Sequence, residues 1–229
     1  MNKQHVLTNL VAAGFLLGAA TAAHANVVSF MASGTGTDGP ESAFATVTTG
    51  TNSVTVALSS LELNPTAAGQ EVSGIQVFMS NVPTSLTLSS SSGTLINIAP
   101  GGGVTPASGP ITHWGAVSGT AGFFLAAAGI GAPGGSPVDL IIGSGPYTNA
   151  NPSITGRNPQ IEVTGTFNLA ATGTTSTTVI TGVTFEFGTG PDSFLPGSPA
   201  VTPVPEPTAW ALLGTGLLGL AFVCRRKTS

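Results

Sequence analysis

Short runs in which apolar and polar residues alternate recur from residue 26 to residue 203, and they constrain the fold more than any other feature. In residues 54–58, for example, three aliphatic side chains alternate with Thr55 and Ala57. Alternation with a period of two puts every second side chain on the same face of a β-strand. The polar partners are mostly Thr and Ser, which suit a solvated sheet face. Each run therefore predicts a strand with one buried face.

The expected strands are separated by loops that contain much of the Gly and Pro. They cover residues 27–31, 43–48, 54–58, 72–79, 86–88, 95–98, 113–117, 123–127, 138–142, 161–167 and 183–187. Two packed antiparallel sheets are a natural way to bury this many one-sided strands. We therefore predict an all-β fold over residues 26–187, a two-sheet antiparallel β-sandwich of the jelly-roll kind. Prolines are frequent in residues 188–203, which predicts a semi-rigid extended linker.

Charged residues are scarce, at 6% of the chain, against roughly 25% in an ordinary soluble domain. Between residues 26 and 203 there are eight acidic side chains and a single basic one, Arg157. A protein that binds nucleic acid needs many cations to neutralise phosphates, so this composition excludes that class. It also argues against most charge-dependent catalysis.

The same region has few side chains that could serve as catalytic groups. His113 is its only histidine, no G-x-S-x-G motif accompanies it, and Cys224 is the only cysteine of the chain. A Ser-His-Asp triad and a zinc site both lack their usual residues. An extracellular hydrolase needs only two carboxylates and stays open as a minor alternative. Glu62, Glu162 and Glu186, however, fall on polar faces of predicted strands and are expected to be solvated. We expect no enzyme, no catalytic residue, no metal and no cofactor.

Two binding hypotheses follow from the remaining residues. Trp114 and Tyr147 are the only Trp and Tyr of this region, and their rings could stack on a sugar in a carbohydrate-binding module. The loop that contains Asp38 and Glu41 offers two carboxylates to calcium, although its spacing is not that of an EF-hand. Core packing is the alternative for the aromatic residues, and a solvated turn is the alternative for the loop.

The first 25 residues have the parts of a secretory signal peptide. Lys3 gives a positive start, and an apolar run follows from residue 10 to residue 20. Ala23 and Ala25 form the A-x-A pattern that places cleavage before Asn26. The apolar run is shorter than the roughly 20 residues that span a bilayer. We expect signal peptidase to remove this helical leader during export.

The last 26 residues, 204–229, begin with an extended strip formed by Pro205, Glu206 and Pro207. Each proline fixes its own φ angle and disfavours a helix at the residue before it. A backbone of this kind is accessible to a processing enzyme, whereas a peptide bond inside a helix is not.

An apolar stretch follows at residues 208–224, at the lower length limit for a transmembrane helix. The basic residues after it predict that the tail ends in the cytoplasm and that the domain lies outside the inner membrane. The expected anchor residues are Trp210, Leu212, Leu213, Leu217, Leu218, Leu220 and Phe222, and the basic stop is Arg225, Arg226 and Lys227.

Strip, apolar stretch and basic end occur in the order that resembles the PEP-CTERM sorting signal of Gram-negative bacteria. The resemblance covers residues 204–229. It implies that an exosortase, an integral-membrane enzyme, recognises Pro205, Glu206 and Pro207 and removes the tail. It also implies association with surface exopolysaccharide and with biofilm. We therefore expect an exported, non-enzymatic cell-surface or matrix protein that is held transiently in the inner membrane.

Overall fold

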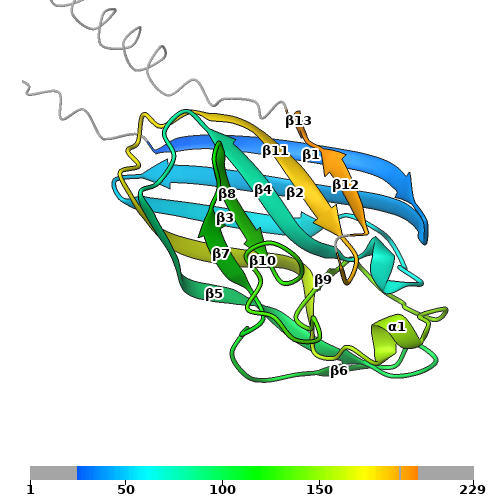
Figure 1. Cartoon of the computed structure of the whole chain (residues 1–229). Coiled ribbons are helices and arrows are strands. Elements are labelled where there is room, and N and C mark those ends of the chain that lie inside the picture. Colours follow the sequence, from blue (N-terminus) through cyan, green and yellow to red (C-terminus); the bar gives the residue numbers. More distant parts are fainter. Residues whose placement is uncertain (1–24, 191, 201–229) are drawn as a thin grey trace, which may run out of the picture.

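The computed structural model describes residues 25–190 and 192–200, and in them the chain is mostly β (Figure 1). The helical elements are the single turn α1 (Pro152–Thr155) and the 3-10 turn η1 (Ala68–Gln70). The strands are β1 Asn26–Gly36, β2 Gly39–Gly50, β3 Ser53–Ser60, β4 Val72–Met79, β5 Ser85–Ile98, β6 Val104–Pro106, β7 Gly115–Ser118, β8 Gly122–Ala126, β9 Ile141–Ile142, β10 Gln160–Thr172, β11 Ile180–Phe187, β12 Ser193–Pro196 and β13 Ser198–Pro199. The predicted β class is confirmed, and each expected strand overlaps an observed one.

Backbone pairing joins these strands into one large mixed sheet. Its main order is β12-β11-β4-β9-β10-β3-β2-β1-β13, with β5 and β6 attached beside β10 and with β8 and β7 attached beside β4. The expected division into two separate antiparallel sheets is therefore not what the pairing shows. The short strand β9 makes the connection, because Ile141 pairs with Val72 of β4 and, in parallel, with Ile161 of β10.

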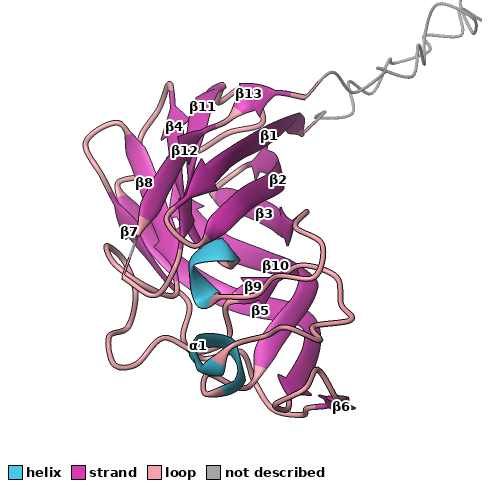
Figure 2. Ribbon diagram, turned by 90° about the vertical axis from the view of Figure 1, so that its right-hand side faces the viewer, coloured by secondary structure: helices cyan, strands magenta, loops and turns pink. Residues whose placement is uncertain are grey.

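The sheet folds over so that its two halves face each other across a common core. Figures 1 and 2 show β1, β2, β3, β10 and β5 in one layer and β4, β8 and β11 in the other. Buried side chains from both layers form the core, among them Phe30, Leu58, Phe167, Val77 and Phe185. Burial of each side chain of this size stabilises the fold by about 1.5–3 kcal/mol. The alternation seen in the sequence thus has its physical counterpart in this core.

A smaller hydrophobic cluster packs the two helical turns against one end of the sheet. It contains Ile98, Ile142, Tyr147 and Ile154 together with Ala68 of η1. The helix α1 begins at an Asn151 cap, whose side chain accepts a hydrogen bond from the backbone N–H of Ser153 at 2.8 Å. Asn is a favoured residue at this position, because its oxygen satisfies a helix N–H that lacks a partner.

Residues 192–200 differ from the expected linker. Instead of extending away from the domain, they form β12 and β13, which pair with β11 and β1. Prolines can occupy such positions because edge strands do not need every backbone N–H. Among the described residues, no helix has the length and apolar character to cross a membrane. The signal segment up to residue 24 and the predicted span 208–224 lie outside the described residues.

Candidate functional site

Residues 193–200 connect the two extremes of the main sheet order, and we call them the closing segment. β12 pairs with β11 at one extreme, and β13 pairs with β1 at the other. Between and after these pairs, the backbone N–H of Gly197 donates to the carbonyl of Val183 at 2.9 Å, and that of Ala200 donates to the carbonyl of Ser29 at 2.8 Å. The last described residues of the chain are therefore part of the sheet.

Two glycines allow the closing segment to approach the core. A Cβ atom on Gly197 would lie 2.5 Å from Val183 Cγ2 and 3.2 Å from Phe30 Cβ, both inside van der Waals contact. A Cβ atom on Gly34 would lie 2.8 Å from Leu195 Cδ2. The lack of a side chain at these positions lets β12 and β13 pack directly over β1 and β11.

Glu41 of β2 holds the start of the closing segment. Its side chain is buried, and the hydroxyl of Ser193 donates a hydrogen bond to its Oε2. Burial raises the pKa of Glu41, the bond from Ser193 lowers it, and the nearby carboxylates of Asp192 and Asp38 raise it. In the part of the chain that the structure describes, no basic side chain forms an ion pair with Glu41.

Glu186 of β11 lies opposite Phe194 of β12 and is also buried, with 2% of its surface exposed. Desolvation raises the pKa of Glu186 to about 7. Its Oε2 has no hydrogen-bond partner among the described residues, and a Cβ atom on Gly74 would lie 2.5 Å from it. The expectation of a solvated Glu186 was wrong, because the glycine opposite it lets the carboxyl group lie flat against β4.

Glu71 is the most deeply buried carboxylate of the domain. Burial raises its pKa well above the ordinary value, while the positive charge of the Arg157 guanidinium lowers it. Within the described residues neither of its carboxyl oxygens has a hydrogen-bond partner, and the Gln160 side chain also has none. Glu71 and Gln160 were not predicted from the sequence. Glu71 immediately precedes β4 and Gln160 is the first residue of β10, and at such positions alternation does not indicate which side chain is buried.

Trp114 and Tyr147 are not brought together and do not present ring faces to solvent. Trp114 is 3% exposed, its ring centroid lies 4.3 Å from that of Phe167, and its Nε1 donates to the carbonyl of Asp139 at 2.7 Å. Tyr147 is 1% exposed, belongs to the smaller cluster, and donates its hydroxyl to the carbonyl of Gly143 at 2.7 Å. Core packing, the alternative considered for both residues, describes these positions.

His113 forms the one ion pair of the described residues. Its Nδ1 lies 3.3 Å from Oδ2 of Asp139, which also accepts the backbone N–H of Thr112 at 3.0 Å. The Thr112 hydroxyl lies 3.3 Å from the same Nδ1, and among the described residues no Ser, Thr or Cys side chain forms a hydrogen bond with Nε2 of this histidine. The arrangement orders the loop before β7.

The proposed calcium ligands lie near each other, at the turn between β1 and β2. Asp38 packs against Gly69 of η1, and Glu41 is engaged by Ser193. Among the described residues, no three or more His, Cys, Asp or Glu side chains are grouped as they would be to hold a metal ion.

The sorting residues predicted from the sequence lie beyond the described part of the chain. These are Ala23, Pro205, Glu206, Pro207, the anchor residues from Trp210 to Phe222, and Arg225, Arg226 and Lys227. Asn26, the residue after the predicted signal-peptide cleavage, is described and is the first residue of β1, and its side chain donates to the carbonyl of Thr178 at 3.0 Å.

Residues 203–227 match the model of the PEP-CTERM protein-sorting motif. No curated protein and no solved structure matches the chain. The match confirms the sorting signal that the sequence predicts at this end. It implies an exported protein that an exosortase processes at a C-terminal signal.

Proposed function

We propose that this PEP-CTERM protein is a non-enzymatic cell-surface or matrix protein. In this proposal signal peptidase removes residues 1–25, the apolar tail holds the domain at the inner membrane, and an exosortase then cuts near Pro205, Glu206 and Pro207. The released or transferred β domain becomes part of the extracellular layer, beside surface polysaccharide and in biofilm.

The observation that carries the proposal is the small number of residues between the end of the folded sheet and the start of the sorting motif. The sheet ends at Ala200, where the backbone still donates to Ser29, and the motif begins at residue 203. The five residue steps from Ala200 to Pro205 span at most about 18 Å. The chain length therefore keeps Pro205 within this distance of the sheet edge at Ala200. All described sheet pairs come before residue 205, so cleavage there leaves them intact.

A carbohydrate-binding role is the second candidate, and the outer face of the β1-β2-β3-β10-β5 layer favours it. On this face Thr55 donates to Asn168 at 2.9 Å, and Asn168 donates to Ser90 at 3.0 Å. On the same face the Ser59 and Thr164 hydroxyls, from β3 and β10, lie 2.8 Å apart. Rows of ordered, uncharged hydroxyl and amide groups match the chemistry of a neutral polysaccharide.

Intact-mass measurement on cell fractions tests the leading proposal. In cells with the exosortase, we expect an extracellular form that lacks residues 1–25 and the tail. In cells without the exosortase, the tail should stay on the protein, and the protein should stay in the membrane fraction. A Glu206→Ala variant should behave in the same way, with Glu62→Ala as a matched carboxylate control outside the motif. A tail that remains uncut in both strains would overturn the proposal.

Co-sedimentation with a neutral polysaccharide tests the second candidate. A Thr55→Val, Asn168→Leu double variant removes hydroxyl and amide groups from the outer face, and we expect it to weaken retention. The control is Thr175→Val, which changes an exposed hydroxyl in the loop before β11. Equal retention of both variants and the parent chain would count against this face as the binding surface.

A further inference from the structure

Charge is segregated along the strand direction in the described domain. β1 begins at Asn26, and Ala200, the last described residue, bonds to Ser29 of the same strand. We call the end of the domain where β1 begins the exit end, and the opposite end the distal end. All formally charged side chains of the described residues lie at the distal end. They are Asp38, Glu41, Glu62, Glu71, Asp139, Arg157, Glu162, Glu186 and Asp192.

The strand register places these residues without ambiguity. Asn26 pairs with Thr49 at the exit end, whereas Gly36 pairs with Gly39 at the β1–β2 turn that contains Asp38. In the other layer, Val72 at the start of β4 pairs with Phe187 at the end of β11. Val72 also pairs with Ile141 of β9, which pairs with Ile161 at the start of β10, so Glu71 and Glu186 share the distal end. β10 likewise begins at the distal end, because its residue Thr164 pairs with Ser59 near the end of β3.

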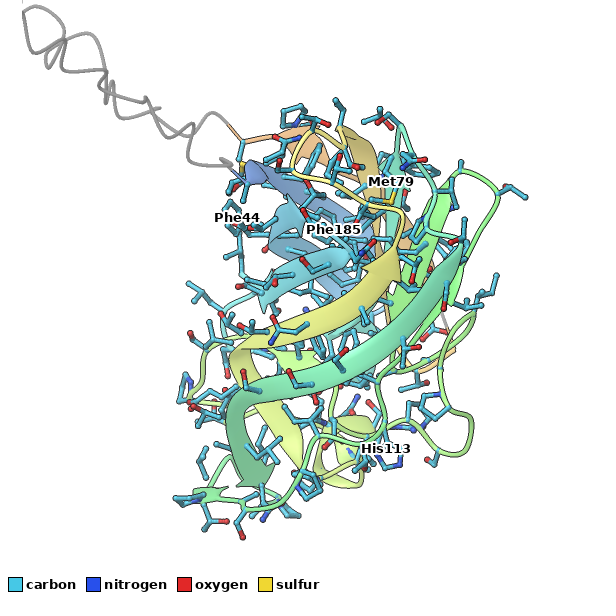
Figure 3. All side chains as sticks on the ribbon, turned by 90° about the vertical axis from the view of Figure 1, so that its left-hand side faces the viewer. Phe44, Met79, His113 and Phe185 are labelled. Atoms are coloured by element: carbon cyan, nitrogen blue, oxygen red, sulfur yellow. The ribbon has the colours of Figure 1, made fainter. Side chains whose placement is uncertain are left out.

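The exit end consists of uncharged residues. Its loops cover residues 50–53, 80–85, 118–122 and 172–179, and they contain only Gly, Ser, Thr, Asn, Pro, Ala and Val. Val27 and Val179 are 56% and 50% exposed there. Met79, labelled in Figure 3, is the last residue of β4 and pairs with Ile180 at this end. Exposed apolar side chains such as Leu63 occur at the distal end as well, so charge is what distinguishes the two ends.

The separation between the ends is large compared with the range of electrostatic forces in salt. A strand of 11 residues such as β1 is roughly 35 Å long. The Debye length at physiological ionic strength is about 8 Å. If an anionic surface lies against the exit end, salt therefore screens most of its repulsion of the carboxylates at the distal end. If the distal end faced that surface, its carboxylates would be repelled.

We propose that the exit end is a membrane-facing surface. Before the tail is cut, the exit end rests against the lipid bilayer, and the distal end with its carboxylates points away from the bilayer. The inference rests on the tail anchor of the proposed function. Ala200 is eight residues before the apolar stretch at 208, which limits their separation to about 28 Å. A tether this short holds the domain at the bilayer, and the uncharged end is the one that approaches anionic headgroups without repulsion.

Fluorescence quenching on the full chain in vesicles tests the proposal. The vesicles contain phosphatidylethanolamine and the anionic phosphatidylglycerol, with a quencher on the headgroups. A dye is attached at Thr51→Cys at the exit end or at Thr37→Cys at the distal end, each in a Cys224→Ser chain. Both threonines are exposed turn residues at opposite ends of β2. We expect strong quenching at position 51 and little at position 37.

Added carboxylates provide a second measurement with a matched control. In the Thr51→Cys chain, Val27→Glu with Val179→Glu puts two charges at the exit end. Leu63→Glu with Val104→Glu changes two exposed apolar residues at the distal end. Each exit-end carboxylate should lower the ratio of docked to undocked domain about fivefold, and added salt should reduce this effect. The distal pair should leave quenching unchanged. Circular dichroism checks that both variants keep their β structure.

The outcomes separate the two proposals. If the chain floats with vesicles and position 51 alone is quenched, the membrane-facing end is supported. If it floats but both positions are quenched alike, or neither is, the orientation is overturned while the anchor stands. If the full chain does not float with vesicles, the anchor fails, and the orientation inferred from it fails too.

Discussion

The backbone N–H of Ala200 donates a hydrogen bond to the carbonyl of Ser29 at 2.8 Å, so the end of the described chain is fixed beside its beginning. This bond extends the pairing of β13 with β1, while β12 pairs with β11. The consequence is that the domain cannot complete its sheet until residue 200 is available, and that the sorting motif starts next to a structured edge.

Gly197 should be intolerant of a side chain. Gly197→Ala places a Cβ atom 2.5 Å from Val183 Cγ2, and the resulting strain should lower the free energy of unfolding by about 1–3 kcal/mol. Urea unfolding measures the change. Gly190→Ala is the control, because a Cβ atom there meets nothing within 4 Å. Equal stability of the two variants would contradict close packing of the closing segment.

Ser193→Ala should destabilise the domain by removing the hydroxyl that donates to buried Glu41. A buried carboxylate left without this partner costs about 1–3 kcal/mol. We expect a lower urea midpoint at neutral pH, with partial recovery when Glu41→Gln is added. Ser198→Ala, at an exposed position of β13, serves as the control. No difference between the two serine variants would argue against this contact.

The domain should be more stable at pH 5 than at pH 8. Burial raises the pKa of Glu186 to about 7 and raises the pKa of Glu71 and of Glu41 as well. The folded state then binds protons more tightly than the unfolded state, so its stability falls as the pH rises above about 4.5 and through the folded pKa values. Urea midpoints measured across this range test the direction.

Glu186→Gln is the variant that isolates one of these groups. Because the amide resembles the protonated carboxyl group, the pH dependence of stability should become shallower near pH 7 in this variant. Glu162→Gln, at a half-buried carboxylate of β10, provides the comparison. A slope unchanged by Glu186→Gln would show that its titration does not govern stability.

The fluorescence of Trp114 should be that of a rigid indole ring shielded from water. In the processed protein it is the only Trp that remains if the tail with Trp210 is removed. Its contact with Phe167 and its burial predict blue-shifted emission that resists quenching by acrylamide. Trp114→Ala should cost about 3–5 kcal/mol of stability. Neutral glycans should leave its emission unchanged, and a glycan-induced shift would revive the sugar-stacking hypothesis for this residue.

The strands were predictable where local alternation alone decides which side chains are buried. Residues 72–79 were expected as a strand and form β4 with the same bounds. By contrast, 86–88 and 95–98 were expected as two strands and form the single strand β5. The serines between these two segments show no alternation of apolar and polar residues, so the sequence pattern does not indicate a strand there. They are extended because Ser90, Ser91 and Ser92 pair with β10.

The sorting signal could be recognised from the sequence because its parts follow one another along the chain and each depends on local chemistry. The buried carboxylates could not. Glu186 occupies a polar position in the alternation of its strand, which predicts exposure to solvent. It is buried because Gly74 of β4 lies opposite it. A buried site of this kind depends on side chains more than one hundred residues apart.

The β class, most strand positions, the low charge and the sorting motif at 203–227 follow from the sequence alone, because each is encoded within a few consecutive residues. Three properties arise only in the folded chain: one sheet connects all strands, residues 193–200 close it, and every formally charged residue of the described domain lies at one end. These properties arise from hydrogen bonds and packing between distant segments. Their energies depend on which surfaces meet, and a local pattern does not contain that information.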